Sequence, residues 1–284
     1  MTTTFNELIA AEKPLVLPVA HDALSARLIE MAGFRAYSVG GFPAVGARLA
    51  YPDLGLVGFA EMRDAVRDIM TGSGLPLMLD CDDGYGDAKN VARTVRTYEA
   101  MGVAGMLIED QTSPKRCGHM AGKDVVPAEV WLGKLRAALA ARRSPDTFIL
   151  ARTDARAVHG LDEALRRGEA AVALGVDGLF VEAPQSLAEL ETIGRSFDLP
   201  LVANMLEDGR TPLLAPAELA AMGFAIVVYP VSLVFRVART IEKALADMKA
   251  GTLSLADEGV GFEDFKRITR FADWAGIEKA AEAD

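Results

Sequence analysis

Short apolar runs alternate with longer amphipathic runs along most of the chain. The apolar runs lack polar alternation, which is typical of parallel strands buried on both faces. They predict eight strands, at Val16–Ala20, Ala36–Val39, Leu77–Leu79, Gly105–Ile108, Phe148–Ala151, Leu179–Val181, Leu201–Ala203 and Ala225–Val228. The amphipathic runs predict helices at Ala23–Ala32, Phe59–Thr71, Asn90–Met101, Ala128–Ala141, Leu161–Leu174, Leu187–Phe197 and Pro216–Met222.

Eight strand-then-helix units are the number that closes a parallel barrel. The pattern therefore predicts an α/β protein with a (β/α)8 TIM barrel. An open, doubly wound sheet is the alternative. We favour the barrel, because no Gly-x-Gly-x-x-Gly segment follows the first strand.

The end of the chain is predicted to be helical, over Thr240–Ala250 and again over Phe262–Ala283, with a hinge at Gly251–Gly261. The second of these helices carries apolar residues at helical spacing, namely Phe265, Ile268, Phe271, Trp274 and Ile277. They either pack on the same barrel or dock on a second subunit. We treat residues 1–284 as one barrel domain, with 251–284 as a helical extension.

Composition narrows the range of partners. With 51% hydrophobic and 25% charged residues, the chain can form a sizeable core. Its net charge of −10 argues against nucleic acid or an anionic membrane as the main partner. Two cysteines do not make a disulfide framework, and neither a secretory signal nor a long apolar run is recognisable. We expect a cytoplasmic protein that binds a small molecule.

Polar residues stand at the carboxyl end of almost every predicted strand, which is where barrel enzymes build their sites. These residues are His21, Asp22, Gly40, Gly41, Asp80, Asp82, Glu109, Asp110, Arg152, Asp154, Glu182, Asn204 and Tyr229. Eight such ends together are hard to explain by packing alone. Of the histidines, His21 and His159 are expected to be structural, with His159 in a loop.

The segment that begins at Asp80 places three carboxylates within four residues. Asp80 and Asp82 point to the same side of an extended chain, and Glu109 at the next strand end could complete the cluster. Oxygen donors of this kind suit Mg²⁺, with Mn²⁺ also possible. The alternative is an Asp-rich turn, since Asp-Gly is typical of turns. Cys81 points the other way and is expected to be buried.

The segment Lys115–His119 places Cys117 between two cations, with a glycine and an imidazole behind it. Nearby positive charge favours a thiolate, so Cys117 is predicted to be reactive. The alternative is a solvated basic turn. Arg152 offers a planar fork for a substrate carboxylate or phosphonate. The alternative for Arg152 is a structural ion pair with Glu182 or Asp154.

These motifs resemble the isocitrate lyase/phosphoenolpyruvate mutase superfamily over nearly the whole chain. The segments that carry the resemblance are Tyr37-Ser-Val-Gly-Gly, Tyr51-Pro-Asp-Leu-Gly, Asp80-Cys-Asp-Asp-Gly-Tyr-Gly, Ile108-Glu-Asp-Gln, Lys115-Arg-Cys-Gly-His, Ala151-Arg-Thr-Asp-Ala, Val181-Glu-Ala-Pro, Asn204-Met-Leu-Glu-Asp-Gly-Arg-Thr-Pro and Tyr229-Pro-Val-Ser. It is similar in particular to the branch of 2,3-dimethylmalate lyase, oxaloacetate hydrolase and methylisocitrate lyase.

The resemblance implies a barrel whose last helices swap between subunits, in a homotetramer built as a dimer of dimers. It implies Mg²⁺ held by Asp80, Asp82 and Glu109. It also implies that Cys117 lies on a gating loop and acts as a catalytic acid. The other residues that it implies are Arg152, Asp53 and His119 for catalysis, and Tyr37, Gly40, Gly41, Gly118, Arg152, Glu182, Asn204 and Ser232 for substrate binding.

The Cys-Gly-His segment favours a carbon–carbon lyase, because the phosphonate and oxaloacetate decarboxylase branches generally lack it. Val39 replaces the Ser or Thr of many lyases, and Arg236 stands one position beyond the arginine that methylisocitrate lyases use for a third carboxylate. We therefore expect Mg²⁺-dependent cleavage of a 2-hydroxy dicarboxylate, of the 2-alkylmalate or 2,3-dimethylmalate type, to a 2-oxo acid and a carboxylic acid. The alternatives are a 2-methylisocitrate lyase, an oxaloacetate decarboxylase, a phosphonate mutase or hydrolase, and a non-catalytic barrel.

Overall fold

The computed structural model describes residues 3–252 and 259–281. The chain divides into two compact units, Met1–Leu233 and Val234–Asp284. The first unit contains the whole barrel. The expected extension, 251–284, falls inside the second unit; part of its hinge (253–258) and its last residues (282–284) lie outside the described residues.

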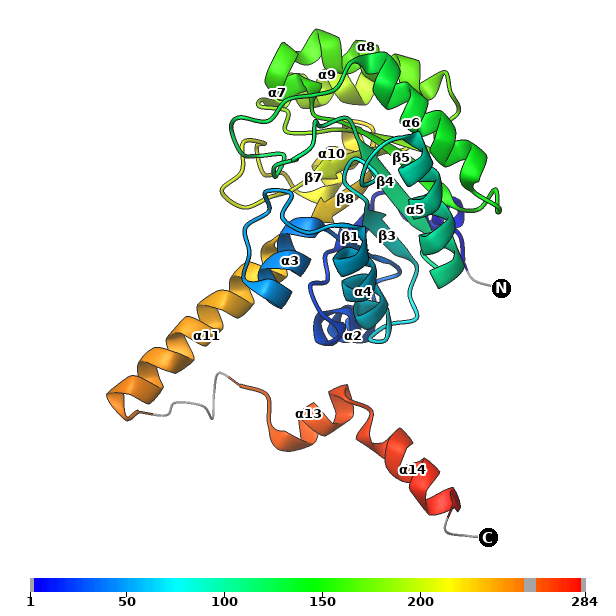
Figure 1. The fold of residues 1–284 in the computed structure, drawn as a ribbon. Helices are drawn as coiled ribbons and strands as arrows, with labels where there is room; N and C mark the ends of the chain where they lie inside the picture. Colours follow the sequence, from blue (N-terminus) through cyan, green and yellow to red (C-terminus); the bar gives the residue numbers. More distant parts are fainter. Residues whose placement is uncertain (1–2, 253–258, 282–284) are drawn as a thin grey trace. The chain divides into compact units, whose positions relative to one another are not determined.

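The predicted barrel is confirmed. Eight parallel strands form one sheet in the order β1-β8-β7-β6-β5-β4-β3-β2, with helices around it (Figure 1). A parallel bridge between Val19 and Ser38 brings β1 beside β2, so the sheet is nearly closed. The strands are β1 Leu15–Pro18, β2 Tyr37–Val39, β3 Leu77–Asp80, β4 Gly105–Glu109, β5 Phe148–Thr153, β6 Gly178–Val181, β7 Leu201–Asn204 and β8 Phe224–Tyr229.

All seven inter-strand helices that the sequence predicts are present; α6 has the predicted bounds, and the other six have shifted ends. The helices of the barrel unit are α1 Phe5–Ala11, α2 Ala23–Met31, α3 Gly41–Leu49, α4 Phe59–Met70, α5 Ala88–Met101, α6 Ala128–Ala141, α7 Ala155–His159, α8 Leu161–Val172, α9 Leu187–Ser196 and α10 Pro216–Ala221. The sequence pattern missed α1, α3 and α7. The loop assignment of His159 was therefore wrong, since this residue ends the short helix α7.

Strand residues alternate between the barrel interior and the layer beneath the helices, as the period of two requires. Leu77 and Leu79 pack outward against the helices, whereas Met78 packs inward. The interior cluster is filled by Leu15, Leu17, Met78, Leu107, Phe148, Leu150, Phe180, Val202 and Ile226. The barrel is thus a packed core, and space for a ligand is confined to its end.

Helix α1 covers the amino-terminal end of the barrel. Phe5 and Leu8 join the interior cluster, and the Phe5 ring lies 6.0 Å from that of Phe148, at the start of β5. A capping box fixes the start of this helix, because the Thr4 side chain accepts from the backbone N–H of Glu7 and Glu7 accepts from that of Thr4. The lower end of the barrel is sealed by apolar side chains.

The second unit is helical and consists of most of α11 (Ser232–Ala250), together with α13 (Phe262–Ile268) and α14 (Phe271–Ala281). The single helix predicted over Phe262–Ala283 was wrong, because Arg270 adopts a left-handed conformation (φ 56°) between α13 and α14. Ala283 lies outside the described residues.

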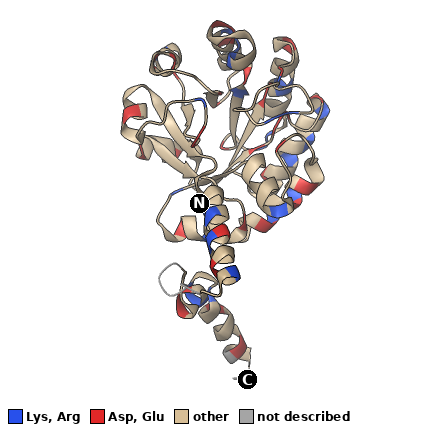
Figure 2. Ribbon diagram, turned by 90° about the vertical axis from the view of Figure 1, so that its left-hand side faces the viewer, with Lys and Arg blue, Asp and Glu red and all other residues tan. Residues whose placement is uncertain are grey.

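The exposed apolar side chains of the second unit include Phe262, Trp274 and Ile277. Within the described part of the chain, no helix is both long and apolar enough to cross a membrane. Acidic and basic positions are interspersed along the helices in Figure 2, which also shows α11 carrying both signs.

Candidate active site

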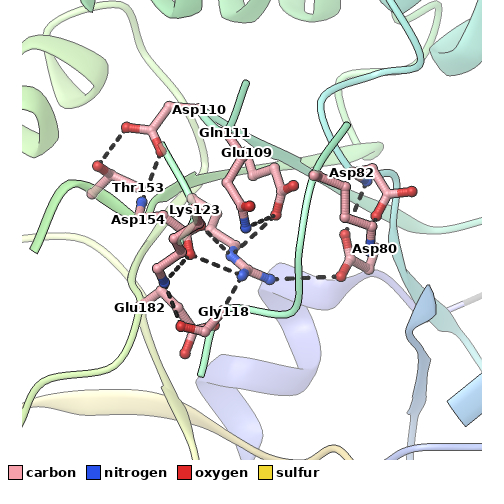
Figure 3. Close-up of polar contacts among 12 residues, drawn as sticks. Asp80, Asp82, Glu109, Asp110, Gln111, Gly118, Lys123, Thr153, Asp154 and Glu182 are labelled. Carbon is pink, nitrogen blue, oxygen red and sulfur yellow. Dashed lines mark hydrogen bonds and ion pairs between the residues drawn. The ribbon is translucent and has the colours of Figure 1, made fainter. Parts of the chain in front are cut away.

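A cavity opens at the carboxyl ends of the strands. Its polar floor follows from the alternation in the barrel, because on five strands an inward apolar residue is followed two positions later by an inward polar one, whereas Leu17 and Ile226 lead to Val19 and Val228. Met78, Leu107, Leu150, Phe180 and Val202 lead in this way to Asp80, Glu109, Arg152, Glu182 and Asn204, and all ten line the cavity. These five strand ends predicted from sequence therefore meet in one place, and Figure 3 shows Asp80, Glu109 and Glu182 among them, whereas His21, Asp22 and Tyr229 do not line the cavity.

Arg152 lies at the centre of this polar floor and is 7% exposed. Its Nε atom is 2.9 Å from Asp154 Oδ2 and 3.4 Å from Glu109 Oε2. Its Nη2 atom is 3.3 Å from Glu182 Oε2, whereas Nη1 makes only a 3.7 Å contact with Asp80 Oδ2. Burial alone would lower the pKa of Arg152, but the surrounding carboxylates raise it well above its usual value. The ion pairs that were the alternative reading are thus formed, and Nη1 is the guanidinium nitrogen least engaged by them.

The carboxylates of Asp80 and Glu109 line the cavity next to Arg152, and Asp82 lies beside Asp80 outside the cavity lining. Burial raises the pKa of all three, and neighbouring carboxylates add to the effect: Asp82 at Asp80, Asp53 and Asp83 at Asp82, and Asp154 and Asp80 at Glu109. Arg152 and Lys115 oppose it at Asp80 and Glu109, and Lys115 alone opposes it at Asp82. Glu109 Oε1 is buried and accepts no hydrogen bond from the residues described. These are properties of a site that a divalent cation would stabilise.

The same described residues contain no group of three Asp, Glu, His or Cys side chains close enough to hold a metal ion by themselves. The donor set fits an ion such as Mg²⁺, which takes a few carboxylates and completes its shell with water. Asp82 already binds other residues: its Oδ1 lies 2.6 Å from Lys115 Nζ, and its backbone N–H donates to Asp80 Oδ1 at 3.0 Å.

Lys115 joins the loop between β4 and α6 to the opposite wall. Its Nζ atom lies 2.7 Å from Asp53 Oδ1, in the segment between α3 and α4, as well as close to Asp82. A Cβ atom on Gly41 would lie only 3.1 Å from this Nζ atom, so Gly41 permits the close approach. Burial would lower the pKa of Lys115, but Asp82 and Asp53 raise it well above its ordinary value.

Cys117 faces the cavity from the same loop, but the predicted thiolate is wrong. The charge of Lys115 is taken up by two carboxylates, and Arg116 Nη1 donates to a backbone carbonyl of its own loop at 3.4 Å. Burial raises the pKa of Cys117 above its ordinary value; the backbone N–H of His119 offsets this in part, and the charge of Glu182 adds to it. Burial therefore favours the neutral thiol over the thiolate, and a thiol in this place can act as a proton donor.

His119 binds Glu182 and the loop after β7. Its Nε2 atom lies 2.9 Å from Glu182 Oε1, and its Nδ1 atom accepts from the backbone N–H of Arg210 at 3.0 Å. Burial would raise the pKa of Glu182, but Arg152 and the His119 hydrogen bond lower it to about 2. Glu182 is thus a fixed negative charge, which His119 and Arg152 hold from two sides.

Most of the predicted residues reach the cavity. Those that line it are Gly40, Gly41, Asp53, Asp80, Glu109, Cys117, Gly118, His119, Arg152, Glu182 and Asn204. Tyr37 does not line it, because the alternation of β2 turns Tyr37 outward and Ser38 inward. Asp82 and Ser232 do not line it either, and the Ser232 hydroxyl donates to Glu207 Oε1 at 2.5 Å. Cys81 is fully buried, as expected.

Several residues of the site were missed in the sequence. Phe42, Pro43 and Leu206 line the cavity, but they lie in a helix and a loop that no periodicity marked. Helix α3 begins at Gly41 after Gly40, which brings the positive end of a helix to the cavity wall. Lys123 was also missed, although its Nζ atom lies 2.6 Å from Asp154 Oδ1 beneath the loop.

Comparison with known proteins agrees with this geometry. Residues 5–249 match the phosphoenolpyruvate phosphomutase family. The chain belongs to this family. The predicted membership in the phosphoenolpyruvate mutase/isocitrate lyase superfamily is therefore confirmed.

Individual members of the superfamily match nearly the full chain. The 2,3-dimethylmalate lyase of Eubacterium barkeri is 40% identical over 280 residues, which cover 98% of this chain and 95% of that protein. The 2-methylisocitrate lyase of Bacillus subtilis is 39% identical over 245 residues, or 86% of this chain and 80% of that one. The structure of an oxaloacetate acetylhydrolase in complex with 3,3-difluorooxalacetate superposes with a TM-score of 0.93, at 31% identity, over 99% of this chain and 97% of that one.

Proposed function

We propose that the protein is a divalent-metal-dependent carbon–carbon lyase that cleaves a 2-hydroxy dicarboxylate with alkyl substituents into a 2-oxo acid and a carboxylic acid. The observation that carries the proposal is the position of Cys117. A half-buried thiol, whose pKa burial raises, lines the same cavity as a guanidinium and a cluster of carboxylates. A proton donor beside an anion-binding arginine is what release of a carbanion next to a carboxylate requires.

Binding of the substrate involves two positive groups. Arg152 presents its Nη1 atom to one substrate carboxylate, and the amino-terminal end of α3, at Gly40 and Gly41, receives the other. Asn204, whose buried Oδ1 accepts no hydrogen bond from the described residues, orients a substrate hydroxyl. Asp80, Asp82 and Glu109 would hold Mg²⁺, or Mn²⁺ in its place, and the bound ion would stabilise negative charge on a substrate oxygen.

The reaction then breaks the bond between the hydroxyl-bearing carbon and its neighbour. The hydroxyl loses its proton to a base, and its oxygen becomes the carbonyl of the 2-oxo acid. The electron pair of the broken bond remains on the neighbouring carbon, which takes the proton of the Cys117 thiol and gives the second carboxylic acid. Glu182, held by His119 and Arg152, keeps the guanidinium in place while substrate charge changes.

The cavity favours a dicarboxylate over a tricarboxylate. In the described barrel unit, the cavity cations Lys115 and Arg152 each contact a protein carboxylate already, and Arg116 donates to the backbone carbonyl of Ala121. The apolar residues Phe42 and Leu206 instead offer room for alkyl groups. Cleavage of 2-methylisocitrate is the second candidate, supported by the 39% identity to the enzyme of that name.

We also propose that the enzyme is a cytoplasmic homotetramer whose last helices pack between subunits. Large apolar side chains on α13 and α14 support this assembly, with Phe262 80% and Trp274 71% exposed. Both cysteines are free, which is consistent with a reducing compartment.

The test is release of 2-oxo acid, with Mg²⁺ present, from 2,3-dimethylmalate, 2-methylmalate, 2-methylisocitrate, isocitrate and oxaloacetate. Native protein, Cys117→Ala and the matched control Cys81→Ala are compared. We expect cleavage of a malate derivative by native protein and by Cys81→Ala, and none by Cys117→Ala. Turnover of 2-methylisocitrate alone would replace the proposed substrate class. Turnover of oxaloacetate that does not depend on the thiol would refute the lyase assignment.

A further inference from the structure

The loop that carries Cys117 is fastened from below by a buried lysine. Lys123 Nζ donates to the backbone carbonyl of Gly118 and lies 2.6 Å from Asp154 Oδ1. The Lys123 side chain is 2% exposed, and that of Asp154 is fully buried. A charged lysine is costly to bury, so both contacts are needed to stabilise it there. In Figure 3, Lys123 and Gly118 lie beside Asp154 and Glu182.

Asp154 is shared between this lysine and the substrate-binding arginine. Its Oδ2 accepts from Arg152 Nε at 2.9 Å, and its Oδ1 accepts from Arg152 Nη2 at 3.2 Å as well as from Lys123. Asp154 is itself held in place, because its backbone N–H donates to Asp110 Oδ1 at 2.7 Å. One carboxylate therefore fixes both the guanidinium and the loop above it.

We propose that Lys123 is a positioning residue that docks the Cys117 loop onto the carboxylate that orients Arg152. The inference deepens the proposed function and rests on it for its catalytic consequence. Gly118 follows Cys117 directly in the chain, so any shift of the Gly118 carbonyl moves the thiol. Lys123 does not touch the reacting atoms; it acts through Gly118 and Asp154.

The other contacts of the loop predict which part of it moves when Lys123 is replaced. Lys115 still binds Asp53 and Asp82, and the Gln111 side chain still bonds the backbone of Arg116 on both sides, at 2.9 and 3.0 Å. On the other side of Gly118, His119 still contacts Glu182 and accepts from the backbone N–H of Arg210. The two ends of the segment therefore stay in place. The part that contains Cys117 and Gly118 loosens, so the thiol becomes accessible while the barrel stays folded.

The experiment is to replace Lys123 by Met, which keeps the length of the side chain and removes its charge. The matched control is Arg142→Met. Arg142 Nη1 likewise joins a carboxylate (Asp177 Oδ2, 2.5 Å) to a backbone carbonyl (Thr147, 3.0 Å), but at the amino-terminal end of the barrel. Alkylation of Cys117 by iodoacetamide is followed by peptide mass spectrometry without substrate, with buried Cys81 as the internal reference. Values of kcat and KM are measured on the substrate that the panel identifies.

We expect Lys123→Met to raise the alkylation rate of Cys117 about tenfold and to lower kcat by a similar factor, with a smaller change in KM. In Arg142→Met, Cys117 should be alkylated at the same rate as in the native protein. A native alkylation rate in Lys123→Met would overturn the proposal. If Lys123→Met lacks the native circular dichroism spectrum, Lys123→Gln takes its place with the same expected direction. Faster alkylation without turnover of any substrate would support the positioning role and refute the lyase assignment.

Discussion

Gly118 leaves no room for a side chain where the Cys117 loop meets the cavity floor. A Cβ atom built there would lie 2.5 Å from Arg152 Nη2 and 2.6 Å from Glu182 Cγ. Ordinary contacts between heavy atoms are about 3.5–4.0 Å, so at least one partner must move by about 1 Å. Neither partner moves freely, because Asp154 holds Arg152 and His119 holds Glu182. We therefore predict that Gly118→Ala lifts the loop from its docked position.

The size of the effect follows from the cost of overpacking. Forcing a methyl group into a well-packed site costs roughly 1–3 kcal/mol. If this cost falls on loop docking alone, the docked population and kcat/KM fall about 5- to 150-fold. Global stability should change little, because the loop can lift without opening the barrel. The alkylation rate of Cys117 should rise in the same variant.

Gly133→Ala is the matched control. Gly133 lies within α6, and its added Cβ would meet no atom within 4 Å. This change should leave kcat/KM unaltered and raise the free energy of unfolding by about 0.5–1 kcal/mol, as expected for Gly→Ala inside a helix. Steady-state kinetics and urea unfolding of both variants provide the assay. Native kcat/KM in Gly118→Ala would refute the argument that the loop must dock closely on Arg152 and Glu182.

Two further predictions concern charged groups. Mg²⁺ should raise the thermal midpoint of the native protein, because it relieves repulsion among buried carboxylates, and this rise should be smaller in Asp80→Asn. Scanning fluorimetry with and without EDTA measures the midpoint of both proteins. An equal rise in the variant would show that the ion binds elsewhere. Glu163, on α8, has its pKa lowered from 4.5 to about 2 by hydrogen bonds from Arg166 and Arg167. The stability that the ionised Glu163 adds is therefore present above pH 4.5 and lost as the pH falls toward 2. Glu163→Gln should lower the free energy of unfolding by about 0.5 kcal/mol at pH 7, and this difference should shrink between pH 4.5 and 3 in urea titrations. A difference that is constant over this range would contradict the ion-pair origin.

The strand pattern predicted the barrel and much of its site, because both depend on local periodicity. Asp80, Glu109 and Arg152 are polar residues at the ends of apolar strands, and parallel strands bring such ends together. It was harder to predict whether a given strand side chain points into the barrel or outward. Tyr37 and Ser38 are neighbours, and only the register of β2 with β3 decides that Ser38 faces inward.

The charge state of Cys117 depends on partners that are remote in sequence. Its neighbour Lys115 is neutralised by Asp53, which is 62 positions earlier, and no local pattern reports that pairing. The contact between Lys123 and Asp154, separated by 31 residues, is hidden for the same reason. Helix α1 was within reach, because Thr4 and Glu7 have the spacing of a capping box.

Because α1 closes the amino-terminal end of the barrel, it limits how substrate can enter the site and how products can leave it. The interior is filled with side chains and closed by Phe5 and Leu8, so within the described chain the site opens only at the strand ends. The substrate and both products of the proposed cleavage would then pass through this same opening, next to Cys117. We therefore expect the product that lies nearer the loop to leave first.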